Sequence, residues 1–330
     1  AQLTAGRGSD EDKAKALYEF VAKNIRYVAI EYGDSGHEPH HAAEVFMNRY
    51  GDCKDQAVLL VALMRGQGLE AFPVLIPTRQ AYPIDKDFAS IHFNHAIAVV
   101  KLGDELIFMD PTSTTTPFRE VPLSDQDRTV MVFFDDGFRI TDIAPSTGNA
   151  VRYSMDIDID EKENAAVTRS VTTEGFFAAG YRYYLKYTHP ELIKEDILQK
   201  MVKIGTFSEL TGYTIEHADD FDFNPKLSYT FNAEKFLNPA GDFRILPALD
   251  QLGLDSNTIG KESRDFPLDF DGVSTKTADV SLSLPHNFIV SHLPQSQVVE
   301  NRWFKLVISY KRLTEGIAFH EEFTVKQRFV

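Results

Sequence analysis

The chain has 330 residues, 43% of them hydrophobic, which suffices for about two globular domains. It carries 34 basic and 49 acidic residues, so its formal net charge is −15. Because binding to a nucleic-acid backbone depends on clustered Lys and Arg, this acidity argues against a nucleic-acid partner. The chain also lacks an apolar run of about 18 residues, which excludes a membrane-spanning helix from this sequence, and its single cysteine excludes an internal disulfide.

The N-terminal part of the sequence predicts helices and then strands. Residues 9–30 show apolar positions at helical spacing, with Ser9 as the N-cap. A second helix is expected over 39–50, beginning near Pro39. A short apolar strand is expected over 71–78. Two hairpins are expected after it, over 94–112 and over 129–143, the second with its turn at Asp135-Asp136-Gly137.

A turn-forming cluster, Pro145-Ser146-Thr147-Gly148-Asn149, indicates a domain boundary. The domains are therefore predicted at 1–145 and 150–330. The second begins with a hairpin over 152–175, and two helices follow it. The remaining predicted elements are strands with period-2 alternation: 226–237, 277–285, 302–313 and 317–329.

Cys53, the only cysteine, stands in the segment NRYGDCKDQAVLLVALMRGQG. Gly51 and Asp52 are typical of a helix start. An apolar stripe at helical spacing follows them: Ala57, Leu60, Val61 and Met64. Cys53 is therefore expected in a first helical turn, where unpaired N–H groups carry partial positive charge. That charge favours the thiolate over the thiol and can stabilise an oxyanion on an attacked carbonyl.

A thiolate nucleophile needs a proton carrier, normally histidine, and a third group that orients it. The hairpin over 94–112 offers both, with His95 on its first strand and Asp110 at the end of its second. The turn is expected at Leu102-Gly103 or Gly103-Asp104. A pairing centred between Leu102 and Gly103 places the two residues directly opposite each other, with Cβ atoms about 4.5–5.5 Å apart. Each residue alone has an ordinary structural explanation. Together, in this geometry, they indicate a Cys–His–Asp catalytic triad.

Three segments carry a resemblance to a known family: YGDCKDQAVLLVALMRGQGLEAFPVLI, FNHAIAVV and LIFMDPTS. They resemble the transglutaminase-like superfamily of cysteine enzymes, whose catalytic residues run in the order Cys, His, Asp. The resemblance implies Cys53, His95 and Asp110 as the catalytic residues. The same order separates the chain from papain-like proteases, whose third residue is usually Asn.

A closer resemblance is to a bacterial group in which such a core lies between two domains of unknown function. The C-terminal half matches that group more loosely, through EGFFAAGYRYYLK, RDFPLDF, SLSLP and ISYKRL. The resemblance implies a further N-terminal domain, so the chain is expected to be part of a longer protein. It also implies a location outside the cytoplasm, in the periplasm.

The resemblance has one clear departure. Animal-type transglutaminases use a tryptophan to bind the oxyanion, whereas the sole tryptophan here, Trp303, lies in the other half of the chain. Asn94, Tyr27 and Tyr50 are the alternative polar contacts. Asp52 is expected to cap its helix, and Asp55 to accept from backbone N–H groups or to hold Lys54.

Two segments have residue types that can bind metals, but neither fulfils the conditions of a known metal site. His37, Glu38 and His41 in GHEPHH have the spacing H-E-x-x-H, but that motif binds zinc on a helix, and the expected helix begins only near Pro39. DDFDFN resembles an EF-hand opening in which Pro225 stands where glycine is needed. We therefore expect no metal and no cofactor.

The predicted fold class is α+β. Residues 1–145 form a transglutaminase-like (papain-like) core with an antiparallel sheet, and residues 150–330 form a mostly antiparallel β domain with two inserted helices. The predicted chemistry is cysteine-dependent hydrolysis or acyl transfer at an amide or peptide bond through a thioester. Its substrate is a peptide, a protein or a cell-envelope amide, and hydrolysis is slightly favoured because water needs no acceptor site. The alternative is a catalytically silent scaffold that binds a peptide or a cell-envelope component.

Overall fold

The computed structural model divides into two compact units, Ala1–Ser146 and Thr147–Val330. The residues that it describes are 2–29, 33–85, 92–247, 249, 252–254, 258 and 260–330. The division falls inside the turn-forming stretch 145–149, where the backbone makes no regular pairing until β8 begins at Asn149. Each unit has its own hydrophobic core.

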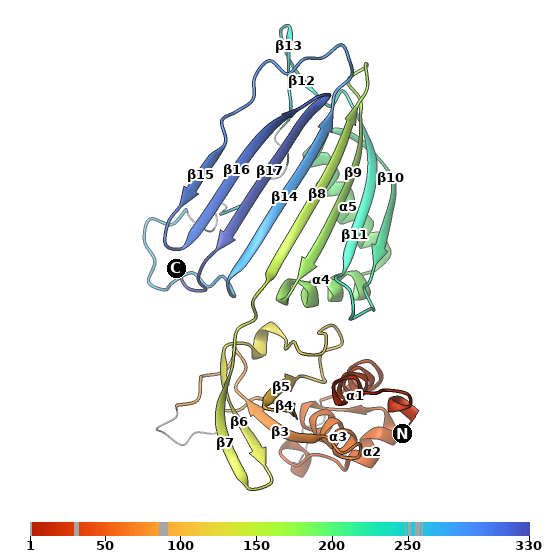
Figure 1. Ribbon diagram of the computed structural model, residues 1–330, viewed down its shortest axis with the longest axis vertical. Helices are drawn as coiled ribbons and strands as arrows, with labels where there is room; N and C mark the ends of the chain where they lie inside the picture. The colour runs from red at the N-terminus through yellow and green to blue at the C-terminus, as the bar shows by residue number, and fades with distance from the viewer. Residues whose placement is uncertain are drawn as a thin grey trace. The chain divides into compact units, whose positions relative to one another are not determined.

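Unit 1 combines three α-helices with a five-stranded antiparallel sheet in the order β5-β4-β3-β6-β7 (Figure 1). Its helices are α1 (Asp10–Asn24), α2 (Ala42–Asn48) and α3 (Cys53–Arg65). Its sheet strands are β3 (Glu70–Ile76), β4 (His95–Leu102), β5 (Glu105–Met109), β6 (Arg128–Phe134) and β7 (Gly137–Ile143). The short elements are η1 (Gln2–Thr4), η2 (Gly33–Gly36), η3 (Leu123–Asp125) and the parallel pair β1 (Arg26–Tyr27) and β2 (Tyr50–Gly51).

Strand β4 is buried on both faces, so it forms the centre of unit 1. Alternate residues of a strand point to opposite faces. Ala98 and Val100 pack in one cluster with Leu60 and Met64 of α3, together with residues of α1. Ile97 and Val99, which point to the opposite face, pack instead with residues of β3 and β6. The helices therefore cover one face of the sheet, and α3 lies against β3 and β4.

The starts of α1 and α3 follow the sequence closely, whereas the end of α1 and the start of α2 do not. Ser9 caps α1 by accepting a hydrogen bond from the Asp12 N–H (3.0 Å). The helix then ends at Asn24, several residues earlier than predicted, because Arg26 and Tyr27 pair with β2. Helix α2 begins at Ala42 with His41 as its N-cap, so the predicted start near Pro39 was too early.

The register of the β4–β5 hairpin differs from the predicted one. Leu102 pairs with Glu105 and Ala98 pairs with Met109, so the turn is centred on Gly103-Asp104. The prediction that His95 and Asp110 lie directly opposite each other was therefore wrong. Asp110 follows the last residue of β5, and in this register the two residues are diagonal neighbours, a separation that a long side chain can bridge. The second predicted hairpin turns at Asp135-Asp136, as expected.

Unit 2 is built on an eight-stranded sheet in the order β10-β11-β9-β8-β14-β17-β16-β15 (Figure 1). Its strands are β8 (Asn149–Ile159), β9 (Ala165–Glu174), β10 (Phe207–Glu216), β11 (Lys226–Glu234), β14 (Ser274–Ser283), β15 (Gln297–Glu300), β16 (Phe304–Leu313) and β17 (Gly316–Val325). The short strands β12 (Asn238–Ala240) and β13 (Phe243–Ile245) form a separate hairpin. All pairings in the large sheet are antiparallel except β8 with β14, which is parallel.

Two helices, α4 (Phe176–Tyr187) and α5 (Pro190–Ile204), are inserted between β9 and β10. Helix α5 buries Ile193, Ile197 and Met201 in the same cluster as alternate residues of β8, β9 and β11. The expected mostly antiparallel β domain with two inserted helices is therefore present. Strand β10 had no predicted counterpart; it lies at one edge of the sheet, and none of its residues is fully buried.

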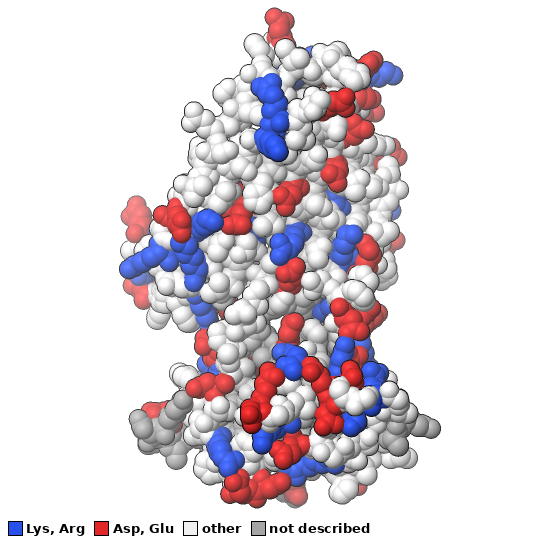
Figure 2. Space-filling model, in the orientation of Figure 1, with Lys and Arg blue, Asp and Glu red and all other residues white. Residues whose placement is uncertain are grey.

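On the face drawn in Figure 2, acidic and basic side chains are interspersed over both units. Among the described residues, no helix combines the length and apolar character that crossing a membrane requires.

Candidate active site

The start of α3 is fixed by a reciprocal capping box, a pair of hydrogen bonds that satisfies N–H groups at the helix start. The Asp55 N–H donates to Asp52 Oδ1, and the Asp52 N–H donates to Asp55 Oδ2, each at 3.2 Å. Both carboxylates are only 1% exposed. Lys54 pairs with Asp52, while Asp55 also accepts the His40 N–H at 2.7 Å and lies 3.0 Å from His40 Nδ1. Cys53 is consequently the first residue of α3, and the buried carboxylates of Asp52 and Asp55 fix the backbone on either side of it.

Gly51 allows this arrangement because Asp55 approaches it closely. A Cβ atom at residue 51 would lie 2.6 Å from the Asp55 Cβ and 3.2 Å from the Val45 Cγ1. Real Cβ atoms do not approach so closely, so any other residue at this position must displace the capping carboxylate. The glycine in the GDC sequence is therefore a requirement of the cap beside Cys53.

Gly51→Ala is expected to lower the free energy of unfolding of unit 1 by about 1–3 kcal/mol, the usual cost of overpacking. Urea denaturation followed by near-ultraviolet circular dichroism measures the change. Gly68→Ala is the matched control for steric contact, since no atom lies within 4 Å of the added Cβ. Its positive φ of 78° makes a moderate loss from backbone strain alone the expected result for the control. A Gly51→Ala protein with unchanged stability would contradict the packing argument.

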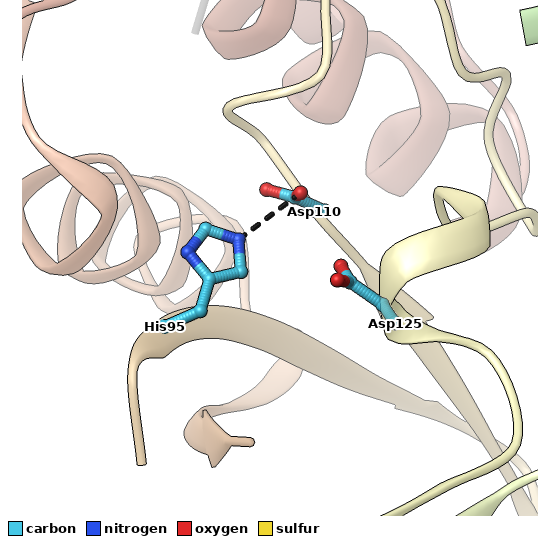
Figure 3. Close-up of side chains that lie close together, drawn as sticks. All are labelled: His95, Asp110 and Asp125. Carbon is cyan, nitrogen blue, oxygen red and sulfur yellow. Dashed lines mark hydrogen bonds and ion pairs between the residues drawn. The ribbon is translucent and has the colours of Figure 1, made fainter. Parts of the chain in front are cut away.

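The side chains of His95 and Asp110 meet at the edge of unit 1 where β4 begins and β5 ends (Figure 3). The His95 Nε2 lies 3.1 Å from the Asp110 Oδ2. The other Asp110 oxygen, Oδ1, accepts from the Thr112 N–H at 2.9 Å and from the Thr112 hydroxyl at 2.7 Å. The carboxylate is thus fixed from two sides and presents one oxygen to the imidazole.

Cys53 lies at the start of α3, and an interaction of its side chain with His95 is one of those that raise the pKa of the imidazole. Because Asp110 occupies Nε2, the ring nitrogen left for sulfur is Nδ1. Cys53 is partly exposed, and the His95 side chain is 15% exposed. The structure therefore pairs His95 with Asp110, and Cys53 affects the same imidazole from the first turn of α3, while the full triad stays a prediction.

Electrostatics at the site favour an imidazolium ion. Burial alone would lower the pKa of His95, but hydrogen bonds with Asp110 and Cys53 and the Asp110 charge raise it to about 11. Burial alone would raise the pKa of Asp110, but the hydrogen bond and charge of His95 and the two bonds from Thr112 lower it below its usual value. An imidazolium beside sulfur is the partner that a thiolate needs.

Helix α1 anchors the loop that carries Asp110. The hydroxyl of Tyr18, a fully buried residue, donates to the Thr116 carbonyl at 2.8 Å and lies 3.4 Å from the Asp110 carbonyl. Burial, followed by the charge of Asp110, raises the pKa of Tyr18 well above its usual value, so it stays a neutral donor. The position of Asp110 therefore depends on a helix that lies about ninety residues earlier in the sequence.

A fourth side chain, Asp125 of η3, was missed by the sequence interpretation. Its carboxyl oxygen, an Asp110 oxygen and a His95 ring nitrogen all lie within 4.8 Å of one another. Figure 3 shows the Asp125 carboxyl group turned towards the other two side chains. Such a set can bind a metal in principle, but here Nε2 of His95 is already paired with Asp110. No local pattern around Asp125 could have revealed this proximity, because it arises from tertiary packing.

The remaining predicted residues have other partners. The Asn94 amide lies on Thr78, donating from Nδ2 to Oγ1 at 2.9 Å and accepting the Thr78 N–H at 2.8 Å, so it supports the start of β4. Tyr27 and Tyr50 lie on the paired strands β1 and β2 and are both exposed. The predicted EF-hand-like loop is held by a buried arginine, since Arg182 Nη2 donates to the Phe223 carbonyl at 2.8 Å.

Comparison with known proteins gives two family matches. Residues 1–111 match the transglutaminase-like superfamily, and residues 224–330 match a domain of unknown function, DUF3858. No curated protein matches the chain.

Two solved structures are similar to this chain. A proposed protease from Parabacteroides distasonis ATCC 8503 is 12% identical with a TM-score of 0.57, over 100% of this chain and 48% of that protein. The chain thus spans about half the length of that relative, and the likeness shows the shared fold. A proposed cysteine protease from Cytophaga hutchinsonii is 20% identical with a TM-score of 0.29, over 44% of this chain and 45% of that protein.

The transglutaminase-like match in unit 1 includes Cys53, His95 and Asp110, and the DUF3858 match covers β11 to β17 of unit 2. The chain is therefore similar to the transglutaminase-like superfamily over residues 1–111 and to DUF3858 over residues 224–330.

Proposed function

We propose that the chain is a cysteine-dependent enzyme that cleaves amide or peptide bonds through a thioester intermediate. The observation that carries the proposal is the His95–Asp110 pair, whose imidazole has a raised pKa to which Cys53 contributes. The match of residues 1–111 to the transglutaminase-like superfamily supports it. The structurally similar Parabacteroides distasonis protein was described as a proposed protease, which agrees with a peptide substrate.

In the first half of the reaction, Cys53 Sγ attacks the carbonyl carbon and the carbonyl oxygen becomes an oxyanion. The N–H groups of Cys53 and Lys54, the first two of α3, have no acceptor within the helix and are the nearest donors for that charge. His95 carries the proton of the thiol and passes it to the leaving amine as the C–N bond breaks. Asp110 holds the ring orientation and stabilises the imidazolium throughout.

In the second half, water or an amine attacks the thioester. His95 accepts a proton from the attacking group, the C–S bond breaks, and the proton returns to sulfur. Water yields a free acid and makes the enzyme a peptidase or amidase, whereas an amine yields a new amide. We propose hydrolysis as the main reaction, because water needs no dedicated acceptor site.

We further propose a peptide, protein or cell-envelope amide as the substrate. The partly exposed sulfur permits attack on an extended chain. The periplasmic location implied by the resemblance stays a prediction.

Trapping of the acyl-enzyme tests the proposal. The protein is incubated with a library of peptides and peptidoglycan fragments, and intact-mass spectrometry is expected to show an adduct on Cys53 that hydroxylamine removes. Cys53→Ala is expected to show no adduct. His37→Gln, which changes an exposed histidine of the same unit, is the matched control and should retain the adduct.

The same experiment separates the candidate functions. Release of a shortened peptide without added amine indicates hydrolysis, and incorporation of a labelled primary amine indicates transfer. If peptides bind with the same affinity to the wild type and Cys53→Ala, and no adduct or product forms, the silent-scaffold alternative is correct.

A further inference from the structure

The buried carboxyl group of Asp125 has an oxygen atom without a hydrogen-bond partner. Asp125 is 0% exposed. Its Oδ1 accepts the Ser124 hydroxyl at 2.8 Å, but its Oδ2 has no partner among the described residues. A buried carboxylate oxygen left in that state is costly. Protonation of the carboxyl group lowers this cost, and the resulting O–H group is a donor that needs a hydrogen-bond acceptor.

The backbone around Asp125 is tied down on both sides. The Arg79 N–H donates to the Ser124 carbonyl at 2.8 Å, and the Arg79 guanidinium donates to the Gln126 carbonyl at 3.2 Å. The buried Gln126 side chain donates to the Val121 carbonyl and accepts the Ser146 N–H. The carboxyl group of Asp125 is thus held beside Asp110 by a rigid loop rather than by chance placement of an exposed side chain.

Asp110 has room for one more donor. An ionised carboxylate offers about four lone-pair sites. Three are used, by the His95 Nε2 and by the N–H and hydroxyl of Thr112. A protonated Asp125, with its carboxyl group within 4.8 Å, is the donor that would fill the fourth.

We propose that Asp125 is a positioning residue whose neutral carboxyl group donates its proton in a hydrogen bond to Asp110 and so fixes the carboxylate that orients His95. The inference rests on the proposed function for its catalytic meaning, because Asp125 acts on the reaction only through Asp110. It contacts neither sulfur nor substrate.

The charges that face Asp125 set the pH at which the arrangement changes. Burial and, after it, the Asp110 charge raise the pKa of Asp125 to about 7, while the nearby His95 opposes this rise. Tyr18 from α1 faces the same group and remains neutral, and Arg79 holds the adjacent carbonyls. Below about pH 7 the carboxyl group is neutral and donates; above it, a second negative charge stands beside the pair and the hydrogen bond to Asp110 is lost.

The histidine nitrogen signals report this step directly. In protein labelled with ¹⁵N-histidine, the His95 Nε2–H signal, assigned with His95→Gln, is followed from pH 5 to 9. Because His95 itself stays protonated over this range, the wild type is expected to show a shift step near pH 7 that belongs to Asp125. Asp125→Asn keeps a permanent N–H donor and is expected to show no step. The matched control Asp142→Asn removes an exposed carboxylate of the same unit and should keep the step.

The rate at which iodoacetamide alkylates Cys53 at pH 6 measures how Asp125 affects the reactivity of the sulfur. Asp125→Ala is expected to slow the alkylation about tenfold, the worth of one hydrogen bond to a charged group, and Asp125→Asn to restore most of the rate. A step that persists in Asp125→Asn, a wild-type profile without a step, or a step abolished by a chelator would each overturn the inference. Slow alkylation of the wild type itself would instead count against the proposed function, and the nitrogen titration would remain interpretable.

Discussion

His95→Gln is expected to slow the alkylation of Cys53 by iodoacetamide about 10²-fold at pH 6 and only slightly at pH 10. The reason is the source of the thiolate. A free cysteine, with a pKa of about 8.5, is less than 1% ionised at pH 6, whereas a sulfur paired with an imidazolium is ionised there. The pKa of His95, raised to about 11, keeps the ring protonated at both pH values in the wild type. Without the ring, no imidazolium stands beside the sulfur to favour the thiolate at low pH.

The alkylation is quenched at successive times and the product is quantified by mass spectrometry, which gives the rate at each pH from 6 to 10. His37→Gln, an exposed histidine of the same unit, is the control and should follow the wild-type profile. If His95→Gln reacts as fast as the wild type at pH 6, the thiolate does not depend on the imidazole and the triad interpretation fails. A uniform loss of reactivity that persists at pH 10 would indicate misfolding around α3 instead of a lost ion pair.

Asp110→Asn is expected to lower the free energy of unfolding of unit 1 by about 3–5 kcal/mol near pH 5, as loss of one partner of a buried ion pair usually does. The pH window follows from the two shifts. The lowered pKa of Asp110 gives stability that is present above its ordinary value of 3.8 and is lost as the pH falls through the lower folded value. The raised pKa of His95 gives stability that is fully present below 6.5 and is lost as the pH rises through about 11. Both contributions are complete only between these ordinary values, so the difference between variant and wild type should be largest there.

The two units offer an internal control for this measurement. The sole tryptophan, Trp303, lies in unit 2, so its fluorescence follows the unfolding of that unit. Hydrogen exchange of the α3 amides follows unit 1. We expect Asp110→Asn to change the exchange and leave the fluorescence transition unaltered. An equal loss in both signals would mean that the substitution disturbs more than the His95 pair.

The features that the sequence predicted well are those that depend on neighbouring residues. Ser9 caps α1, and the Asp52–Asp55 box begins α3 at Cys53, because each cap needs only a side chain and an N–H three residues later. The turn at Asp135-Asp136 is equally local. The end of α1 was predicted less well, because Arg26 and Tyr27 pair with β2, a partner more than twenty residues away, instead of continuing the helix.

The error in the β4–β5 register had little effect on the predicted site. The true pairing shifts each partner by two residues, and a two-residue shift keeps every side chain on its original face. His95 and Asp110 therefore remain on the same face as diagonal neighbours and still meet at 3.1 Å. A one-residue error would have separated them.

Asp125 shows what the sequence could not supply. It follows Asp110 by fifteen residues, in a 3₁₀ turn whose position depends on Arg79 and Gln126. Neither contact has a sequence signature. The same holds for β10 and for the parallel pairing of β8 with β14, which joins strands separated by two helices and more than a hundred residues.

The parallel pairing of β8 with β14 determines when the large sheet can form during synthesis and which fragments of the chain contain all its strands. Strand β14 must align with β8, which emerges from the ribosome long before it, so the centre of the eight-stranded sheet cannot close until late in translation. A segment limited to residues 224–330 would contain β11 and β14 but lack β8 and β9, which lie between them in the sheet. Both β11 and β14 would then have unpaired backbone N–H and C=O groups along one side, which promotes aggregation. The compact unit that contains the whole sheet begins at Thr147, well before the DUF3858 match begins.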